Sequence, residues 1–355
     1  MNYRICTKCV MDTSDERISF DDKGVCNHCR RVLSLELVKR KRKTSAFSSK
    51  NIFSKYDCII GLSGGIDSCY LLHWAVENGL KPLAVHYDSG WNSELSQKNI
   101  ELLVNKANVD LVTEVADWES MRQIQLAFLR SGVTNCDIPQ DHAFVSVLYK
   151  YAIRYRVFNI LTGHNSSTES ILPTEWGYTS RDSIYFKSIL TSQGFSWRNL
   201  NYPLTASWRL FLYSKVIPFK FPLEEIAYEK NNAKKVLENV YGWKDYGGKH
   251  MESMFTSFFQ SVYLPEKFNF DKRRAHLSSM IISGQVTREE ALNQLNFSPV
   301  DEMRRKELID YVCKKLNISL SEMKEILSRE NRRTLNDFKY NPLIKIIRER
   351  KYHSR

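Results

Sequence analysis

The sequence contains no long uninterrupted run of apolar residues. The nearest stretch, residues 208–223, is interrupted by Arg209, Lys215 and Lys220, and the opening residues MNYRICTKC lack the apolar core of a signal peptide. We therefore expect a soluble, cytoplasmic protein without a membrane span. Because thiols stay reduced in the cytoplasm, clustered members of the eight cysteines indicate metal binding or catalysis rather than disulfide bonds.

Acidic side chains are outnumbered by basic ones, 40 to 52, which gives a formal net charge of +12. Such a charge suits an anionic partner, for example tRNA, a nucleotide sugar or a membrane surface. Much of the excess lies in two short basic runs, residues 38–45 and 348–355, and such runs are most often merely solvated. The length of 355 residues and the hydrophobic content of 43% indicate a large globular α/β domain with a smaller attachment.

The eight cysteines include two closely spaced pairs near the beginning of the chain. Cys6 and Cys9 form one Cys-x-x-Cys knuckle, and Cys26 and Cys29 form the other. Four thiolates complete a tetrahedral zinc site without an open position, so we predict a structural zinc ribbon over residues 1–37. The alternative is four free cysteines that come together by chance. His28 is expected to be a neighbour of the site rather than a ligand.

Residues 56–68, YDCIIGLSGGIDS, combine a short apolar strand pattern, a glycine-serine loop and the start of a helix. Gly64 and Gly65 let the backbone approach a phosphate, and a helix N-terminus offers unpaired N–H groups to it. The loop lacks the GKS or GKT ending of a Walker A motif, and it is not a GxGxxG fingerprint. The pattern predicts nucleotide binding; a plain turn is the alternative.

Strand-like and helix-like segments alternate after a basic, serine-rich linker at residues 38–55. Strands are expected at 58–62, 83–88, 111–116 and 158–163, with helices between them, which predicts a doubly wound parallel sheet over residues 56–200. Ligands of such sheets lie beyond the carboxyl ends of the strands, where Ser63, Asp88 and Gly163 fall. Residues 201–355 are expected to be a mainly helical region for the substrate and partners.

The string Ser63 to Ser68, SGGIDS, resembles the SGGxDS loop of the ATP-pyrophosphatase (PP-loop) superfamily. The resemblance implies a fold of that type, cleavage of ATP between its α and β phosphates, and Mg²⁺ as a cofactor. It assigns catalytic roles to Ser63, Asp67 and Ser68. Asp67 is alternatively only a charge at the helix N-terminus. His86, which the resemblance places among the ATP-binding residues, is alternatively a packed histidine. The residues predicted to bind ATP are Leu62, Ser63, Gly64, Gly65, Asp67, Ser68, His86, Tyr87, Asp88, Gly163, His164, Asn165 and Glu169.

Residues 134–144, TNCDIPQDHAF, place four reactive side chains ahead of a helix. A tRNA thiolase would carry sulfur on a cysteine such as Cys136, but this residue is alternatively a small apolar wall residue. Asp137, Asp141 and His142 are predicted to orient a polar substrate or to assist proton transfer. A helix N-cap explains an aspartate here equally well.

Residues 241–292 carry GWKDYGGKH together with DKRRAHLS. With the zinc ribbon and the SGGIDS loop, this segment resembles the N-acetyl sugar amidotransferases of surface-polysaccharide biosynthesis. The resemblance implies cationic donors for a diphosphate or sugar carboxylate and carboxylates for sugar hydroxyls; solvated surface is the alternative for the basic run. The implied substrate-binding residues in this segment are Asp245, Lys249, His250, Glu252, Lys272, Arg273 and Arg274. Outside this segment, Lys187 in RDSIYFKSIL is predicted to have a catalytic role in stabilising the leaving pyrophosphate.

The resemblance implies a reaction in which ATP, a nucleotide-linked N-acetyl sugar and ammonia give an acetamidino sugar, AMP and pyrophosphate. No glutaminase nucleophile motif occurs in the chain, so ammonia is expected from separate glutaminase and cyclase-like partner proteins, and nucleic acid is not expected as a partner. The alternative is a zinc-ribbon PP-loop enzyme that thiolates tRNA. A non-enzymatic ATP-sensing adaptor would require a damaged loop, and the loop is intact.

Overall fold

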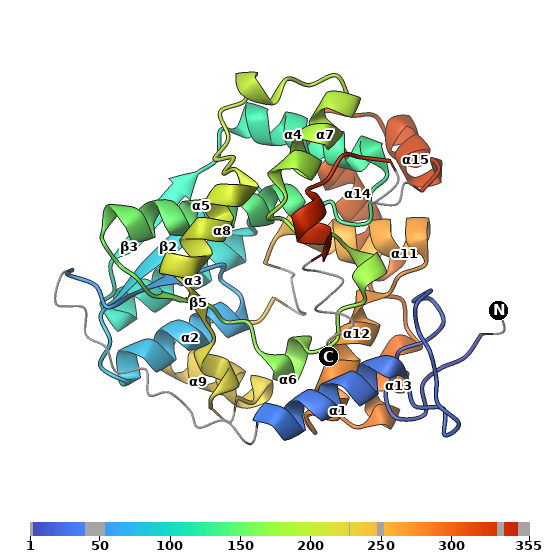
Figure 1. Cartoon of the computed structure of the whole chain (residues 1–355), viewed down its shortest axis with the longest axis horizontal. Coiled ribbons are helices and arrows are strands. Elements are labelled where there is room, and N and C mark those ends of the chain that lie inside the picture. Colours follow the sequence, from blue (N-terminus) through green and yellow to red (C-terminus); the bar gives the residue numbers. More distant parts are fainter. Residues whose placement is uncertain (1–2, 40–53, 227, 247–251, 332–336, 347–355) are drawn as a thin grey trace.

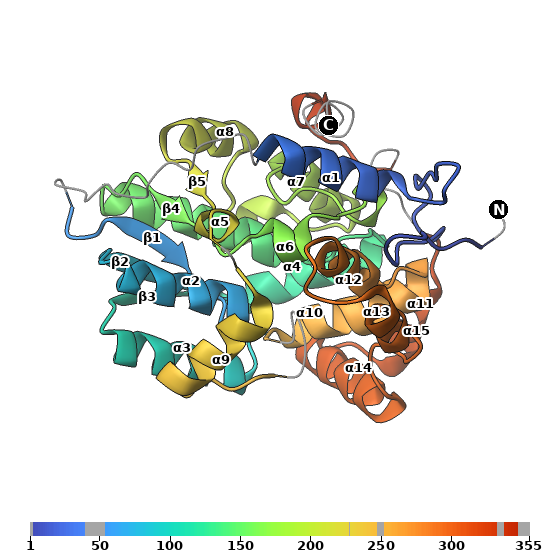
Figure 2. The same ribbon diagram turned by 90° about the horizontal axis from the view of Figure 1, so that it is seen from below.

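The computed structural model describes residues 3–39, 54–226, 228–246, 252–331 and 337–346. In these residues, five parallel strands form a sheet in the order β3-β2-β1-β4-β5 (Figures 1 and 2). The four expected strands are present, and the fifth arises from two residues beyond the expected sheet region. The strands are β1 (Cys58–Gly61), β2 (Pro82–Asp88), β3 (Leu111–Val115), β4 (Ile160–Leu161) and β5 (Phe219–Lys220).

Helices cover both faces of the sheet, which confirms the predicted doubly wound α/β fold. Alternate side chains of β1 enter different cores: Ile60 packs with Leu71 and Leu237 on one face, and Ile59 packs with Val147 on the other. This alternation follows from the two-residue period of a strand that is buried on both faces. The covering helices are α2 (Ile66–Glu77), α3 (Glu94–Ala107) and α9 (Lys230–Tyr241) on the first face, and α5 (Ile138–Arg154) and α8 (Ser207–Val216) on the second.

The C-terminal part is helical, as expected, and lies beside the sheet rather than on it (Figures 1 and 2). It includes a π-helical turn, η4, within a continuous helical stretch. The helices of this part are α10 (Met254–Phe258), η4 (Phe259–Tyr263), α11 (Leu264–Phe268), α12 (Lys272–Ile282), α13 (Arg288–Leu295), α14 (Glu302–Leu316) and α15 (Leu320–Ser328).

The remaining elements lie before the sheet in the chain, between its strands or, in one case, directly after β5. Helix α4 follows β3 and begins at an Asp117 cap that accepts a hydrogen bond from Ser120 N–H. The remaining elements are α1 (Asn27–Lys39), α4 (Trp118–Ser131), α6 (Ser166–Glu169), α7 (Ser183–Ser192) and the 3₁₀ turns η1 (Thr174–Trp176), η2 (Trp197–Asn199) and η3 (Pro222–Glu224). Among the described residues, no helix combines the length and the apolar character that crossing a bilayer requires.

The C-terminal part is attached to the sheet at the carboxyl end of β2. Ser93 N–H donates to the Glu252 carbonyl at 2.9 Å, and Met254 N–H donates to the Trp91 carbonyl at 2.8 Å. These bonds form an antiparallel bridge between Asn92 and Ser253. The start of the C-terminal helices is therefore held at the edge of the sheet where the strands end.

Candidate functional site

The loop that follows β1 lies at the carboxyl edge of the sheet and carries the SGGIDS motif. Gly64 has a φ of +85°, and a methyl group built on it would lie 2.5 Å from Ser96 Oγ. Glycine fits this position, whereas another residue would force strain and displacement. Gly65, the N-cap of α2, supplies no side-chain cap. The first N–H groups of α2 therefore need partners from outside the helix.

Ser63 and Ser68 hold this loop from within. Ser63 N–H donates to Ser68 Oγ at 3.3 Å, and Gly65 N–H donates to Ser63 Oγ at 3.3 Å. The two hydroxyl oxygens lie 3.1 Å apart, and Ser68 also donates to the Gly65 carbonyl at 3.1 Å. The structure thus brings together the two hydroxyl groups that the sequence predicts for phosphate contact.

The segment after β4 lies directly against the start of α2. A methyl group built on Gly163 would lie 2.8 Å from the carbonyl oxygen of Asp67, so the two backbones are in close contact. His164 hydrogen-bonds to Glu169, and Asp67 accepts a hydrogen bond from the Tyr228 hydroxyl. Asp67, Gly163, His164 and Glu169 line a cavity of about 240 Å³ beside the loop. Its carboxylates are suitable oxygen ligands for Mg²⁺.

The end of β2 supplies a buried histidine next to the loop. His86 Nδ1 donates to the Leu62 carbonyl at 2.7 Å, and His86 Nε2 lies 3.0 Å from Asn92 Nδ2, which donates to it. Burial lowers the pKa of His86, so the ring is neutral near pH 7. Asp88 accepts hydrogen bonds from Gly90 N–H at 2.9 Å and from Asn92 at 3.0 Å. His86 and Asp88, which the sequence predicts to bind ATP, therefore fix the turn that follows β2.

A larger cavity of about 1650 Å³ joins the loop to the C-terminal part. Its volume exceeds the range of roughly 300–1,000 Å³ that single small-molecule sites occupy, so it has room for more than one ligand. Three regions of the chain contribute polar side chains to it. These include Ser63, His86 and Tyr87 from the sheet edge, Asp137, Gln140 and Asp141 from the start of α5, and Glu252, Thr256, Gln260, Lys272 and Arg273 from the C-terminal part.

Asp137 is a carboxyl group of this cavity with a strongly raised pKa. Its Oδ1 accepts hydrogen bonds from Gln140 Nε2 at 3.0 Å and from Thr256 Oγ1 at 3.2 Å. Burial, followed by the charge of Asp141, raises the pKa of Asp137 to about 7, while the Lys272 ammonium opposes this rise. A carboxyl group with such a pKa can accept and release protons near neutral pH.

Two predicted residues of the α5 and α7 region lie outside the cavity linings. His142 is fully buried; its Nδ1 bonds the Ser180 carbonyl at 2.5 Å, and its Nε2 accepts from Thr205 N–H at 3.0 Å. The Lys187 ammonium lies 3.8 Å from the centre of the Trp197 ring. Both side chains thus make packing contacts in this structure, and their assigned roles stay predictions.

Asn165 and Cys136 are also completely buried. Asn165 accepts a hydrogen bond from Thr168 N–H at 3.0 Å and caps α6. The Cys136 thiol lies 3.7 Å from the carbonyls of Phe128 and Val133, and burial raises its pKa. A thiol in this environment is not ionised near neutral pH, whereas a reactive cysteine requires the thiolate.

The basic and acidic residues of the C-terminal segment are distributed over several contacts. Asp245 pairs with Lys234 at 2.6 Å, and Arg273 binds the Asp271 carboxylate at 2.6 Å while lining the large cavity. Arg274 instead pairs with Asp12 of the N-terminal region at 3.0 Å. Among the predicted substrate-binding residues, Lys249 and His250 lie outside the described residues.

The site contains aromatic residues that the sequence did not assign. Tyr228 donates to Asp67, Tyr246 lies against the start of α2, and the Trp243 indole donates to the Gly64 carbonyl at 3.2 Å. Trp243 and Tyr246 belong to the GWKDYGGKH segment, whose resemblance pointed to the sugar site. Their position against the phosphate loop follows only from the three-dimensional fold.

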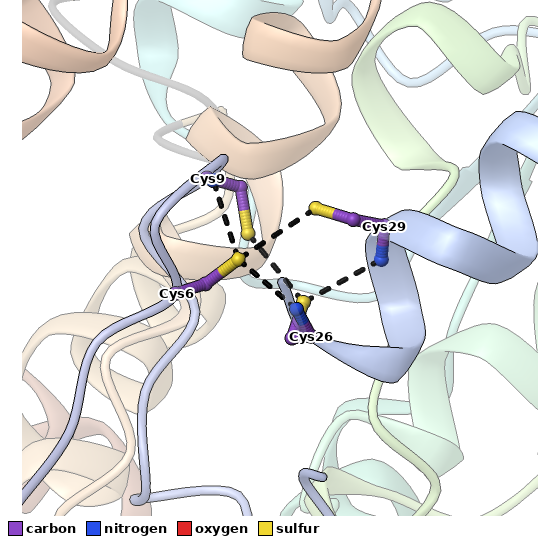
Figure 3. Close-up of side chains that lie close together, drawn as sticks. All are labelled: Cys6, Cys9, Cys26 and Cys29. Carbon is purple, nitrogen blue, oxygen red and sulfur yellow. Dashed lines mark hydrogen bonds between the residues drawn. The ribbon is translucent and has the colours of Figure 1, made fainter. Parts of the chain in front are cut away.

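The four N-terminal cysteines converge as predicted (Figure 3). Their sulfur atoms all lie within 4.8 Å of one another, with Cys6 and Cys29 4.0 Å apart and Cys9 and Cys26 3.7 Å apart. Zinc–sulfur bonds of about 2.3 Å place tetrahedral sulfur ligands about 3.8 Å apart. Cys26 N–H donates to Cys6 Sγ at 3.2 Å, and such bonds favour the thiolate that zinc requires. The cluster therefore fits a structural zinc ion.

The cysteine cluster is attached to the C-terminal helices (Figure 2). The Arg288 guanidinium donates to the Cys6 carbonyl at 3.0 Å and to the Cys9 carbonyl at 3.1 Å. Arg274 donates to the Val10 carbonyl at 2.9 Å. His28, next to the cluster, forms a buried 2.5 Å contact with Asp15 rather than joining the four sulfurs.

Comparison with known proteins identifies the C-terminal part. Residues 252–351 match the family described as "LPS biosynthesis protein WbpG-like, C-terminal domain". This part of the chain is therefore similar to the WbpG-like C-terminal domain, in line with the expected resemblance to proteins of surface-polysaccharide biosynthesis. No curated protein matches the sequence.

Solved structures with a similar arrangement are distant. A U34-tRNA thiolase from Methanococcus maripaludis, solved with its 4Fe-4S cluster, is 14% identical with a TM-score of 0.35 and coverage of 80% of this chain and 88% of its own. An NMN synthetase from Francisella tularensis is 18% identical with a TM-score of 0.28 and coverage of 68% and 93%. An NH₃-dependent NAD synthetase from Campylobacter jejuni is 14% identical with a TM-score of 0.28 and coverage of 81% and 93%. Likenesses this distant carry no functional argument.

Proposed function

We propose that this chain is an ATP-dependent amidotransferase that converts the acetamido group of a nucleotide-linked N-acetyl sugar into an acetamidino group. The observation that carries the proposal is the shared cavity, because Ser63 of the phosphate loop and Thr256 of the WbpG-like domain line the same space. One shared space allows an activated phosphate and a sugar acceptor to meet.

Activation of the acetamido group is the first chemical requirement. The amide oxygen attacks the α-phosphorus of ATP, the bond from that phosphorus to the bridging oxygen breaks, and pyrophosphate leaves. The loop N–H groups and the Ser63 and Ser68 hydroxyls would stabilise the departing negative charge. When bound, Mg²⁺ would neutralise further charge on the phosphates, with Asp67 and Glu169 as its suitable ligands.

Displacement by ammonia is the second requirement. Ammonia adds to the imidate carbon, loses a proton, and expels AMP, which carries away the former amide oxygen. Asp137 is suited to accept this proton, because its carboxyl group lines the cavity and has a pKa raised to about 7. The cationic amidine product would lie near the Asp141 carboxylate. We also propose that separate glutaminase and cyclase-like proteins supply the ammonia.

Sulfur transfer to tRNA is the alternative function. It requires an accessible thiolate, and Cys136 is buried beside backbone carbonyls. Cys58, Cys69 and Cys313 are buried as well. These environments favour amidation over thiolation.

The test is an incubation of the purified chain with ATP, ammonium and nucleotide-linked N-acetyl sugars, followed by nucleotide analysis. AMP formation should require both the sugar and ammonium, and mass spectrometry should detect a product in which NH replaces the acetamido oxygen. Asp67→Asn should abolish AMP formation, whereas Asp22→Asn, an exposed change in the zinc region, should not. AMP formation that depends on tRNA and not on the sugar would reject the proposal.

A further inference from the structure

The segment that contains Trp243 and Tyr246 lies on the phosphate loop and is fixed there. The Trp243 indole donates to the Gly64 carbonyl at 3.2 Å, and its ring is 2% exposed. Asn99 of α3 holds the intervening Lys244 backbone with two hydrogen bonds of 2.8 and 2.9 Å. The Tyr246 ring packs edge-on against Trp243, with ring centres 5.4 Å apart. These contacts place the Tyr246 hydroxyl at the start of α2 in the ligand-free chain.

The Tyr246 hydroxyl uses an N–H group of the phosphate loop. Ile66 N–H, at the first residue of α2, donates to the Tyr246 oxygen at 3.1 Å. An amide N–H has one hydrogen, so this group cannot donate fully to a phosphate oxygen at the same time. A phosphate that takes the usual position at this helix N-terminus must compete with Tyr246.

Glu252 approaches the same point from the start of the WbpG-like domain. A methyl group built on Gly65 would lie 3.2 Å from Glu252 Oε1 and 3.4 Å from the Tyr246 oxygen. A carboxylate is favoured at a helix N-terminus for the same reason as a phosphate, and it repels a phosphate that approaches the same place. The Glu252 carbonyl accepts a hydrogen bond from Ser93 N–H, which holds the Glu252 backbone at the edge of the sheet.

We propose that Tyr246 and Glu252 occupy the phosphate position of the ligand-free chain, and that a polyphosphate binds by displacing both side chains. Glu252 lines the large cavity as well as the smaller one beside the loop. Displacement moves its carboxylate towards the space assigned to the acceptor. Phosphate binding at the loop and the charge of the acceptor cavity are thereby coupled through one side chain.

Binding of inorganic pyrophosphate, measured by isothermal titration calorimetry without added divalent cations, tests this proposal. Tyr246→Phe removes only the competing hydroxyl, and Glu252→Gln removes only the charge. Each variant should bind pyrophosphate more tightly than the wild type, with Glu252→Gln tighter by about tenfold, a change equivalent to roughly 1.4 kcal/mol. Tyr213→Phe, on α8, is the matched control and should leave the affinity unchanged.

A decrease in pyrophosphate affinity in these variants would overturn the proposal. If the Tyr246 hydroxyl donates to the bound phosphate, Tyr246→Phe will bind pyrophosphate more weakly. Unchanged affinity in both variants, while the wild type binds, would reject the displacement and leave the amidotransferase proposal standing. If neither the wild type nor the variants bind pyrophosphate, the displacement proposal fails, whereas the amidotransferase proposal is decided by the AMP assay. The titrations are repeated with Mg²⁺ to separate two roles of Glu252. Weaker binding by Glu252→Gln only with Mg²⁺ would assign Glu252 as a metal ligand. Weaker binding both with and without Mg²⁺ contradicts displacement.

Discussion

Replacing Asp137 with asparagine is expected to stabilise the protein at pH 8 while removing most of its activity. Burial, and then the Asp141 charge, raises the pKa of Asp137 from 3.8 to about 7. A shift of about three units, at 1.36 kcal/mol per unit, corresponds to about 4 kcal/mol of free energy. Both hydrogen bonds from Gln140 and Thr256 end on Oδ1, an acceptor that asparagine keeps.

The pH dependence of this effect has a definite sign. In the unfolded chain the Asp137 carboxyl ionises above about pH 4, whereas in the folded chain it keeps its proton up to about pH 7. The folded wild type therefore loses stability as pH rises from about 4 to 7, and the loss is complete above pH 7. Asparagine does not titrate in this range. The free-energy difference between Asp137→Asn and the wild type should be near zero at pH 4 and largest at pH 8.

Thermal unfolding measured at several pH values is the assay. For a chain of this length, about 4 kcal/mol corresponds to a rise in Tm of about 5 °C at pH 8. Asp22→Asn is the exposed control and should show no pH-dependent difference. A Tm of Asp137→Asn at or below that of the wild type at pH 8, or a difference that is constant with pH, would refute the reasoning.

The activity of the same variant distinguishes proton transfer from simple packing. At a fixed concentration of free ammonia, the amidation rate of the wild type should rise as the pH increases through about 7, because ionised Asp137 accepts the proton. Asp137→Asn should lose this rise and should be slower by roughly 10²–10⁴-fold. A variant that is slow but keeps the wild-type pH profile would assign Asp137 to structure alone.

Three further changes test other parts of the site. Gly64→Ala should weaken ATP binding in calorimetry by about tenfold or more, because of the positive φ and the 2.5 Å contact with Ser96; unchanged affinity would contradict a rigid loop. Cys29→Ser should lower both the zinc content measured by mass spectrometry and the Tm, and an unaltered zinc content would exclude the four-sulfur site. Cys136→Ala should retain AMP formation. Complete loss of AMP formation in this variant would favour sulfur transfer.

The local parts of the site could be predicted from the sequence. A strand, a glycine loop and a helix start occur within residues 56–68. The phosphate-binding character of this loop therefore depends on residues that are neighbours in the chain, and the sequence alone indicates it. The same holds for the cysteine knuckles, whose convergence the structure confirms. Strand β5 is different, because two residues, Phe219–Lys220, give no periodic signal and pair only through the completed sheet.

Interactions between distant segments could not be predicted from the sequence. Asp137 receives its hydrogen bond from Thr256, and the Tyr246 hydroxyl meets Ile66 N–H, in both cases across more than one hundred positions. The family resemblance implied a place for Arg274 at the sugar site, and the structure pairs Arg274 with Asp12 beside the cysteine cluster. Charge and residue type indicate a partner of opposite sign, but only the fold determines which partner is within reach.

Transfer of a heavy oxygen isotope tests the central claim most directly. A nucleotide-linked N-acetyl sugar labelled at the acetamido oxygen is incubated with the purified chain, ATP and ammonium, and the released nucleotide is analysed by mass spectrometry. If the amide oxygen attacks the α-phosphorus, the label must appear in AMP. Release of ADP and orthophosphate, or of AMP without the label, would contradict adenylation of the acetamido group.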